Sequence, residues 1–327
     1  MSTSYEIDVA PVAPSYNSAF AADVLAGLGA SQRQIPARWF YDKRGSELFE
    51  QITQLPEYYP TRTERRILRQ YAKAIAAKTG LGRAVVEFGS GSSAKTPLLL
   101  SAVAPSAYVP VDISGEFLYE SAAALGTVFP KLPIYPVEGD FMHPLVMPEV
   151  VEGMPRLGFF PGSTIGNLLA TEAVDLLRTM ASTLGSDGML LIGIDRVKSA
   201  DVLVPAYDDA QGVTAAFNLN MIRRINRELA GTIPLSDFRH VARWNAEFSR
   251  IEMHLEAKRD LRFTVKGYEF SMLAGETIHT ENSHKYSLQG AELLLRAGGW
   301  SPIENWTDEN ALFSVILASV SESPLFR

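Results

Sequence analysis

Short apolar runs alternate with helical patterns through the middle of this chain, and this alternation restricts the fold more than any other feature of the sequence. The apolar runs predict strands, and the helically spaced patterns predict helices. Strands that alternate with helices form a parallel sheet with right-handed crossovers. The chain is therefore predicted to be an α/β protein with a doubly wound, Rossmann-like sheet. The predicted strands are residues 84–88, 107–111, 132–137, 157–161 and 189–194, and the predicted helices are 94–103, 115–128 and 171–184.

Residues suited to binding a nucleoside follow three consecutive predicted strands. Gly89 and Ser90 begin a glycine-containing turn after the first strand, Asp112 closes the second, and Asp140 with Phe141 follows the third. Open α/β sheets bind ligands at the carboxyl ends of their strands, and glycine lets the backbone approach a ligand closely. An acid after the second strand can accept hydrogen bonds from ribose hydroxyls, and one after the third from an adenine amine. This order predicts an S-adenosylmethionine pocket.

A nucleotide-binding oxidoreductase is the alternative from another class of enzyme. A dinucleotide site favours the pattern Gly-x-Gly-x-x-Gly, and Ala94 occupies the position of the third glycine. Taken singly, the glycine turn also fits a tight strand–helix connection, and Asp112 or Asp140 also fits a helix cap. The end of the chain favours the first interpretation, because a helix at 287–297 precedes two strands at 300–306 and 312–320. That pair resembles the reversed hairpin of class I methyltransferases.

The pattern predicts four segments. Residues 1–62 form an N-terminal arm and a segment of the substrate site, in which Pro56 and Pro60 favour extended or turn geometry around residues 57–59. Residues 63–196, which open with a helix at 63–78, form the cofactor-binding domain. Residues 197–286 form an additional α+β substrate-binding subdomain, with a helix at 213–229 and strands at 251–258, 262–265 and 268–272. Residues 287–327 complete the sheet.

Charge and composition exclude several classes of partner. The 30 basic and 37 acidic residues give a net charge of −7, which disfavours binding to nucleic acid. The chain has no cysteine, and its five histidines lack metal-ligand spacing, so we expect neither disulfides nor a metal. The N-terminus lacks the pattern of a signal peptide, and no apolar stretch reaches membrane-spanning length. We therefore expect a cytoplasmic monomer that binds small molecules.

Six blocks of sequence resemble the histidine-specific Nα-methyltransferases of ergothioneine biosynthesis, and the resemblance runs from about Ala19 to the C-terminus. The resemblance implies a class I methyltransferase fold and three successive transfers of methyl from S-adenosylmethionine to the amine of L-histidine, which give hercynine. The blocks are WFYD at 39–42, LPEYYPTRTE at 55–64, EFGSG at 87–91, GSTIGN at 162–167, AYDDA at 206–210 and RIEM at 250–253.

The same resemblance assigns roles to individual residues. Lys95 would face the methionine carboxylate of the cofactor. Tyr41 and Asn167 would orient the amine that is methylated, and would therefore be the catalytic residues. The other residues assigned to the cofactor are Gly89, Ser90, Asp112, Asp140 and Phe141, and those assigned to the substrate are Tyr58, Gly162, Tyr207, Met253, Glu281, Asn282 and Ser283, together with Asn167.

Residues Glu281 and Ser283 decide the predicted acceptor. They resemble the family's imidazole clamp, in which the carboxylate accepts a hydrogen bond from one ring nitrogen and the hydroxyl serves the other. Asn282 departs from the apolar residue expected between them in some relatives. The nearest alternative is a methyltransferase of the same family that acts on another amine, such as a tryptophan derivative, whose pocket would not need this carboxylate. A catalytically silent binding module is disfavoured because every matched position is intact.

Overall fold

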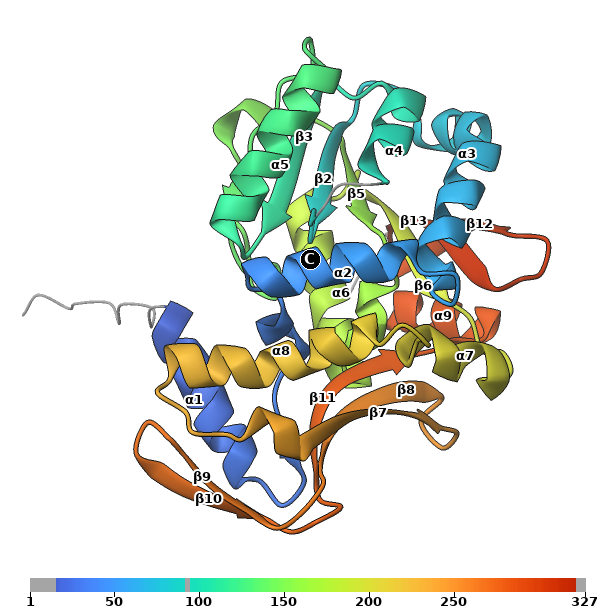
Figure 1. Cartoon of the computed structure of the whole chain (residues 1–327). Coiled ribbons are helices and arrows are strands. Elements are labelled where there is room, and N and C mark those ends of the chain that lie inside the picture. The colour runs from blue at the N-terminus through green and yellow to red at the C-terminus, as the bar shows by residue number, and fades with distance from the viewer. Residues whose placement is uncertain (1–15, 92–94, 322–327) are drawn as a thin grey trace, which may run out of the picture.

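A seven-stranded sheet forms the larger layer of the computed structural model, which describes residues 16–91 and 95–321 (Figure 1). Five strands, β6, β5, β2, β3 and β4, are parallel, and β13 runs antiparallel between β12 and β6. This order confirms the predicted doubly wound sheet with a reversed terminal strand pair. In spatial order the strands are β12 (Trp300–Thr307), β13 (Phe313–Val320), β6 (Met189–Asp195), β5 (Arg156–Phe160), β2 (Ala84–Phe88), β3 (Ala107–Asp112) and β4 (Val137–Glu138).

Helices cover both faces of this sheet, because successive residues of each strand point to opposite faces. Val86 packs with α6 (Ala170–Leu184) and α9 (Leu288–Ala297), whereas its neighbour Val85 packs with α3 (Tyr59–Thr79), α4 (Thr96–Val103) and α5 (Gly115–Val128). The strands are buried on both sides, as expected of a parallel sheet. The carboxyl ends of β2 and β5 lie side by side where the strand order reverses, which is the usual ligand-binding position in such sheets.

A second lobe packs below the carboxyl edge of the large sheet in Figure 1. Its four-stranded sheet has the order β1 (Arg33–Gln34), β11 (Thr277–His284), β8 (Arg250–Ala257) and β7 (Phe238–Asn245), and a hairpin of β9 (Leu261–Val265) and β10 (Tyr268–Met272) extends from it. Its helices are α1 (Tyr16–Gly29), α2 (Lys43–Gln54), α7 (Ala200–Tyr207) and α8 (Val213–Glu228). Short 3-10 helices are η1 (Ala37–Phe40), η2 (Glu149–Val151), η3 (Thr164–Asn167) and η4 (Leu235–Asp237).

The N-terminal segment belongs to the core of this second lobe. Phe20 of α1, Phe40 of η1 and Leu48 of α2 share one apolar cluster with Phe217 of α8 and Leu255 of β8. The rings of Phe40 and Phe217 lie 4.5 Å apart. Segments that are far apart in the sequence therefore form one support for α2, which lies between the large sheet and α8 in Figure 1.

The structure differs from the predicted elements in the third strand, at Pro60 and in several segments that were not predicted. The third strand is confined to residues 137–138 with an isolated bridge at Ile134, because Pro133 and Pro136 cannot donate to a ladder. Pro60 begins α3 instead of breaking it, as proline fits the first turn of a helix. The pattern did not predict α7, β7 or β11. Residues 1–15 of the predicted segment 1–62, together with Ala94 and residues 322–327, lie outside the described residues.

The second lobe contacts the large sheet through η3, which follows β5. A Cβ atom on Gly166 would lie 2.8 Å from the carbonyl oxygen of His284 in β11, so only glycine allows this approach. The Gly166 carbonyl and Nδ1 of His284 are 2.9 Å apart. The end of the fourth parallel strand and the polar strand β11 are thereby fixed side by side. In the described part of the chain, none of the helices has the length and apolarity needed to cross a bilayer.

Candidate active site

A cavity of about 570 Å³ lies at the carboxyl edge of the large sheet, between the two lobes. This volume is in the range of small-molecule sites. Residues from α2, η3, β11 and the turns after β2, β3, β4 and β5 form its wall. Twelve of the predicted site residues line it, namely Tyr41, Tyr58, Gly89, Ser90, Lys95, Asp112, Asp140, Phe141, Gly162, Asn167, Glu281 and Asn282.

The glycine turn after β2 is held to the end of β3 by a carboxylate. Asp112 accepts hydrogen bonds from the backbone nitrogens of Gly91 at 3.1 Å and Ser114 at 2.9 Å. Gly89 has a φ of +72°, and a Cβ atom there would lie 3.3 Å from the ring of Phe141. Close backbone approach and a left-handed conformation both require glycine at this position. The turn therefore leaves a cradle beside an aromatic ring, with carboxylate oxygens at its edge.

Asp140 occupies the corresponding place after β4. Its Oδ1 accepts a hydrogen bond from the backbone nitrogen of Met142 at 2.9 Å, and Arg38 lies 3.7 Å from its Oδ2. A carboxylate has about four acceptor positions, so a further donor can still be accommodated. The adjacent Phe141 ring packs edge-on against Phe160, with centroids 5.8 Å apart. The two acids and the ring thus line one region of the cavity wall.

A buried acid that the sequence analysis did not single out connects this region to the end of β5. Glu64 of α3 has no exposed surface, forms an ion pair with Lys95 and accepts a hydrogen bond from the backbone nitrogen of Gly162 at 2.9 Å. Lys95 therefore reaches the cavity already paired to an anion. The signal was available in the sequence, because Glu64 falls three and four residues before Ile67 and Leu68, on the apolar face of the predicted helix.

Several polar side chains in the cavity wall have no hydrogen-bond partner within residues 16–91 and 95–321. Among them are the hydroxyls of Tyr41 and Tyr58, the amide of Asn167 and the carboxylate of Glu281. Burial raises the pKa of the Glu281 carboxyl to about 7, although the charge of Lys285 opposes this effect. Burial, and then the charge of Glu281, raise the pKa of Tyr41 well above its ordinary value. Buried polar groups are normally paired, so this group is suited to a polar ligand.

Three predicted substrate residues lie behind the cavity wall. Met253 is 2% exposed and pairs with Glu281 in the β8–β11 ladder. The hydroxyls of Tyr207 and Ser283 are 2.7 Å apart, and both oxygens accept hydrogen bonds from Lys285, at 2.9 and 2.6 Å. The hydroxyl predicted to face the ligand therefore belongs to a buried network, which the sequence pattern could not indicate.

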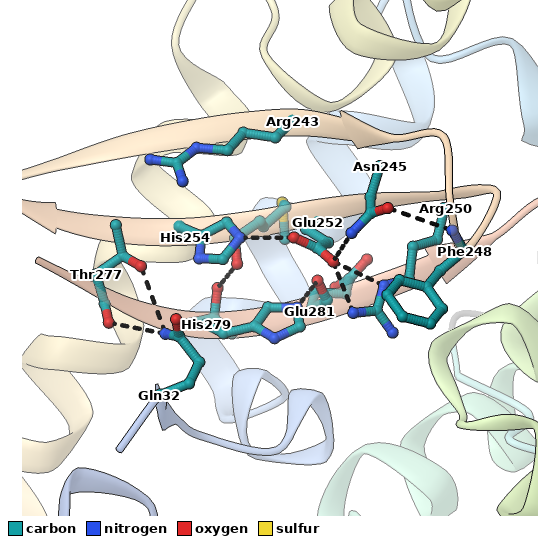
Figure 2. Close-up of polar contacts among 12 residues, drawn as sticks. Gln32, Arg243, Asn245, Phe248, Arg250, Glu252, His254, Thr277, His279 and Glu281 are labelled. Carbon is teal, nitrogen blue, oxygen red and sulfur yellow. Dashed lines mark hydrogen bonds and ion pairs between the residues drawn. The ribbon is translucent and has the colours of Figure 1, made fainter. Parts of the chain in front are cut away.

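A polar cluster on the outer face of β8 and β11 fixes the backbone next to Glu281 (Figure 2). Oε1 of Glu252 accepts hydrogen bonds from Arg250 at 2.8 Å and Asn245 at 2.9 Å, and Nε2 of His254 lies 3.2 Å from Oε2. The ring of His254 stacks on that of His279, whose Nε2 is 3.0 Å from the Glu281 carbonyl oxygen.

Three residues of this cluster could in principle hold a metal ion, which the sequence did not lead us to expect. Ligand atoms of Glu252, His254 and His279 lie within 4.8 Å of one another, which is a possible metal geometry. Arg250 already neutralises the carboxylate, however, so the cluster lacks the negative charge that helps to hold a divalent cation. The register of β11 shifts between His279 and Glu281. We therefore interpret the cluster as an anchor for this irregular part of the strand.

Comparisons with known proteins decide the family. The profile of a family described as "Histidine-specific methyltransferase, SAM-dependent" matches residues 20–320. The chain belongs to this family. It is 42% identical to the histidine N-alpha-methyltransferase of Mycolicibacterium smegmatis over 94% of this chain and 96% of that protein. It is also 42% identical to the enzyme of the same name from Mycobacterium tuberculosis, over 91% and 94% of the two chains.

A more distant relative belongs to a longer protein. The chain is 30% identical to ergothioneine biosynthesis protein 1 of Neurospora crassa over 85% of its own length and 32% of that protein. These matches confirm the family predicted from the six sequence blocks, five of which contribute residues to the cavity wall or to the network behind it. The methyltransferase scaffold therefore brings the glycine turn and the unpaired Glu281 into one cavity.

Proposed function

We propose that this protein transfers methyl groups from S-adenosylmethionine to the α-amino group of L-histidine, three times in succession, to give hercynine for ergothioneine biosynthesis. Family membership and two relatives named histidine N-alpha-methyltransferase support the reaction. The observation that carries the acceptor is the unpaired carboxylate of Glu281 in the same cavity as the glycine turn. A half-buried acceptor without a partner in a cavity wall favours a ligand that brings a ring N–H to it.

The cavity residues fit S-adenosylmethionine, which supplies an electrophilic methyl group when bound. The space beside Gly89, which a Cβ atom would fill, supports close contact with the nucleoside. Asp112 and Asp140 would accept hydrogen bonds from the ribose and the adenine amine, and Phe141 would pack on the base. Lys95 would attract the methionine carboxylate, with its own position fixed by Glu64. Gly89 and Ser90 would supply the backbone that lines the S-adenosylmethionine end of the cavity.

The acceptor end orients the amine and the ring. Asn167 and Tyr41 would hold the neutral amine so that its lone pair points at the methyl carbon, and Glu281 would accept from the imidazole. In each transfer a nitrogen–carbon bond would form as the donor's carbon–sulfur bond breaks. The ammonium formed in the first and second transfers would lose a proton to solvent, whereas the trimethylated nitrogen formed in the third has none to lose. The raised pKa keeps the Tyr41 hydroxyl protonated, so it serves as a hydrogen-bonding group and not as a base. Orientation alone can supply up to about 7–11 kcal/mol.

The other predicted substrate residues have supporting positions. Tyr58 and Asn282 line the cavity and would lie near the imidazole of the substrate. Gly162 presents its backbone beside Lys95. Tyr207, Ser283 and Met253 would contribute from behind the wall. We further propose that the protein works as a cytoplasmic monomer and does not bind nucleic acid; its net charge of −7 supports the last point.

Mass spectrometry of the purified protein with S-adenosylmethionine and a panel of amino acids tests this proposal. We expect histidine to gain one, two and three methyl groups, and other amino acids to remain unmodified. Methylation of tryptophan or its derivatives in place of histidine would overturn the acceptor assignment. An effect of a nicotinamide dinucleotide on melting temperature, without an effect of S-adenosylmethionine, would favour an oxidoreductase.

Histidine binding should weaken as the pH falls through the pKa of Glu281. Burial raises the pKa of this carboxyl to about 7, and only its ionised form accepts from a ring N–H without competition from its own proton. About one tenth of the sites are ionised one unit below the pKa, so we expect a rise in Kd of about tenfold between pH 8 and pH 6. Calorimetry with S-adenosylhomocysteine present measures this. The Glu281→Gln variant should lose the part of the dependence due to this group; an unchanged slope would contradict the assignment.

Replacing Gly166 with alanine should impair catalysis through the position of Asn167. The new Cβ atom would lie 2.8 Å from the backbone oxygen and 3.2 Å from the backbone nitrogen of His284, so η3 must move away from β11. We expect kcat/KM for histidine to fall by about 10- to 100-fold. Gly29→Ala is the control, because nothing lies within 4 Å of a Cβ there. Wild-type kinetics in Gly166→Ala would show that the contact does not position the site.

A further inference from the structure

A lysine with no role so far occupies the centre of a buried network behind the cavity. The side chain of Lys285 has no exposed surface, and that of Asp195 is 1% exposed. Nζ of Lys285 lies 2.8 Å from Oδ2 of Asp195, 2.9 Å from the Tyr207 hydroxyl and 2.6 Å from the Ser283 hydroxyl. An ammonium group has three protons and no acceptor, so these three contacts use all of its donors.

The proton count of this network fixes how its hydroxyls can act. The oxygens of Tyr207 and Ser283 are 2.7 Å apart, and each already accepts an N–H from Lys285. The two hydroxyls carry two protons, of which only one can lie between the oxygens. The other must point away from the pair and from Lys285. No further side-chain acceptor for it occurs in the described part of the chain. The network therefore presents one hydroxyl donor to its surroundings.

This donor lies on the same side of β11 as the unpaired carboxylate. Glu281 and Ser283 are two residues apart in one strand, so their side chains share a face of the sheet. The ring of Tyr207 also stands edge-on to that of Tyr58, which lines the cavity, with centroids 6.1 Å apart. An acceptor in the cavity wall and an ordered donor directly behind that wall thus lie on one face of β11. A neutral imidazole offers the complementary pair, one N–H and one nitrogen lone pair.

We propose that Lys285 is a positioning residue for acceptor specificity: it orders the Tyr207–Ser283 hydroxyl pair as a hydrogen-bond donor beside Glu281, so that the site selects a neutral ring with one donor and one acceptor nitrogen. The inference rests on the proposed function, because it takes the ligand to be an imidazole-bearing amino acid. Without Lys285, the two hydroxyls would be free to accept hydrogen bonds as well as to donate them. A ligand ring that lacks an acceptor nitrogen would then be tolerated, because neither hydroxyl would be forced to donate to the ring.

Lys198 offers a matched control on the same carboxylate. Its Nζ lies 2.6 Å from Oδ1 of Asp195 and 2.7 Å from the Tyr59 hydroxyl, and its side chain is 8% exposed. Within the described part of the chain, it makes no hydrogen bond with Tyr207 or Ser283. Burial would raise the pKa of Asp195, but the two lysines together hold it below its ordinary value. Loss of either lysine therefore disturbs the same buried charge, and only loss of Lys285 disturbs the hydroxyl pair.

Calorimetry on the full chain with S-adenosylhomocysteine tests this. The ligands are histidine and a pyrrolylalanine that keeps the ring N–H but has C–H in place of the acceptor nitrogen. We expect wild type to prefer histidine by about 10- to 100-fold, and Lys285→Met to reduce that preference to within about threefold. Lys198→Met should keep the wild-type preference even if its melting temperature falls. Equal loss in both variants, or an unchanged preference in Lys285→Met, would overturn the inference.

Two measures keep the test decisive. If Lys285→Met is not recovered folded, Lys285→Gln replaces it; the glutamine carbonyl would accept the remaining hydroxyl proton, so the preference should again fall, and its retention would refute the role. Because the experiment measures binding and not methylation, failure of the proposed reaction can be distinguished from failure of the inference about Lys285. Wild type that binds histidine without methylating it would refute the reaction alone, whereas wild type that does not bind histidine would refute both.

Discussion

Replacing Glu281 with alanine should raise the KM for histidine by about 100-fold or more while the affinity for S-adenosylmethionine stays within about threefold. The carboxylate of Glu281 lies in the cavity wall and has no hydrogen-bond or ion-pair partner among the described residues. Its loss would leave the ring N–H of the substrate buried without an acceptor, and sites built around such a hydrogen bond discriminate strongly. Steady-state kinetics and calorimetry measure the two affinities.

Two further variants separate charge from shape. Glu281→Gln keeps the size of the side chain and one carbonyl acceptor, so its KM should lie between those of wild type and Glu281→Ala. Glu276→Ala removes a surface carboxylate just before β11 that pairs with Arg33, and should have wild-type kinetics. A collapse of cofactor affinity in Glu281→Ala would show that the division of the cavity into two ends is wrong.

Replacing Glu64 with alanine should damage both ends of the cavity at once and destabilise the fold. Glu64 is fully buried, pairs with Lys95 and accepts the Gly162 backbone N–H at 2.9 Å. Its removal would leave a mostly buried ammonium and a backbone donor without their partner. Breaking a buried pair in this way costs about 3–5 kcal/mol of unfolding free energy. We expect kcat/KM to fall by about 100-fold with respect to each substrate, because Lys95 is assigned to the cofactor and Gly162 to the amino-acid substrate.

Denaturant unfolding and initial rates at varied concentrations of each substrate measure these effects. Glu64→Gln is the informative companion, because its carbonyl can still accept from Gly162 while the charge is lost. It should therefore retain the acceptor kinetics better than the cofactor kinetics. An alanine variant that unfolds like wild type and has normal kinetics would show that Lys95 and Gly162 do not depend on this acid.

The central sheet could be predicted from the sequence because its signals are local. Each strand is a short apolar run next to a helical pattern, and the residues at the strand ends mark the ligand edge without knowledge of distant contacts. The strand β11 could not be predicted in this way. It reads Thr277–His284 with polar residues on both faces, because one face forms the site and the other carries the Glu252–His254–His279 cluster. Functional demands there override the apolar alternation that identifies a strand.

The partners of the site residues depended on long-range packing. The family resemblance supplied Glu281 and Ser283, but nothing local indicates that Ser283 is bound to a buried lysine two residues later. The pairing of Glu64 with Gly162 joins residues 98 positions apart, through the contact of α3 with the end of β5. Such pairings follow from the assembled fold, so the sequence could indicate which residue types matter without indicating which of them act through others.

The unpaired carboxylate of Glu281 makes the stability of the fold depend on pH. A carboxyl whose folded-state pKa is raised to about 7 gives its full contribution to stability below the unfolded pKa near 4.5, and loses it as the pH rises through 7. At neutral and alkaline pH, burial of the ionised carboxylate therefore lowers the free energy of unfolding. An amino-acid ligand that donates a hydrogen bond to this carboxylate would offset that loss. The melting temperature should therefore rise with the concentration of substrate.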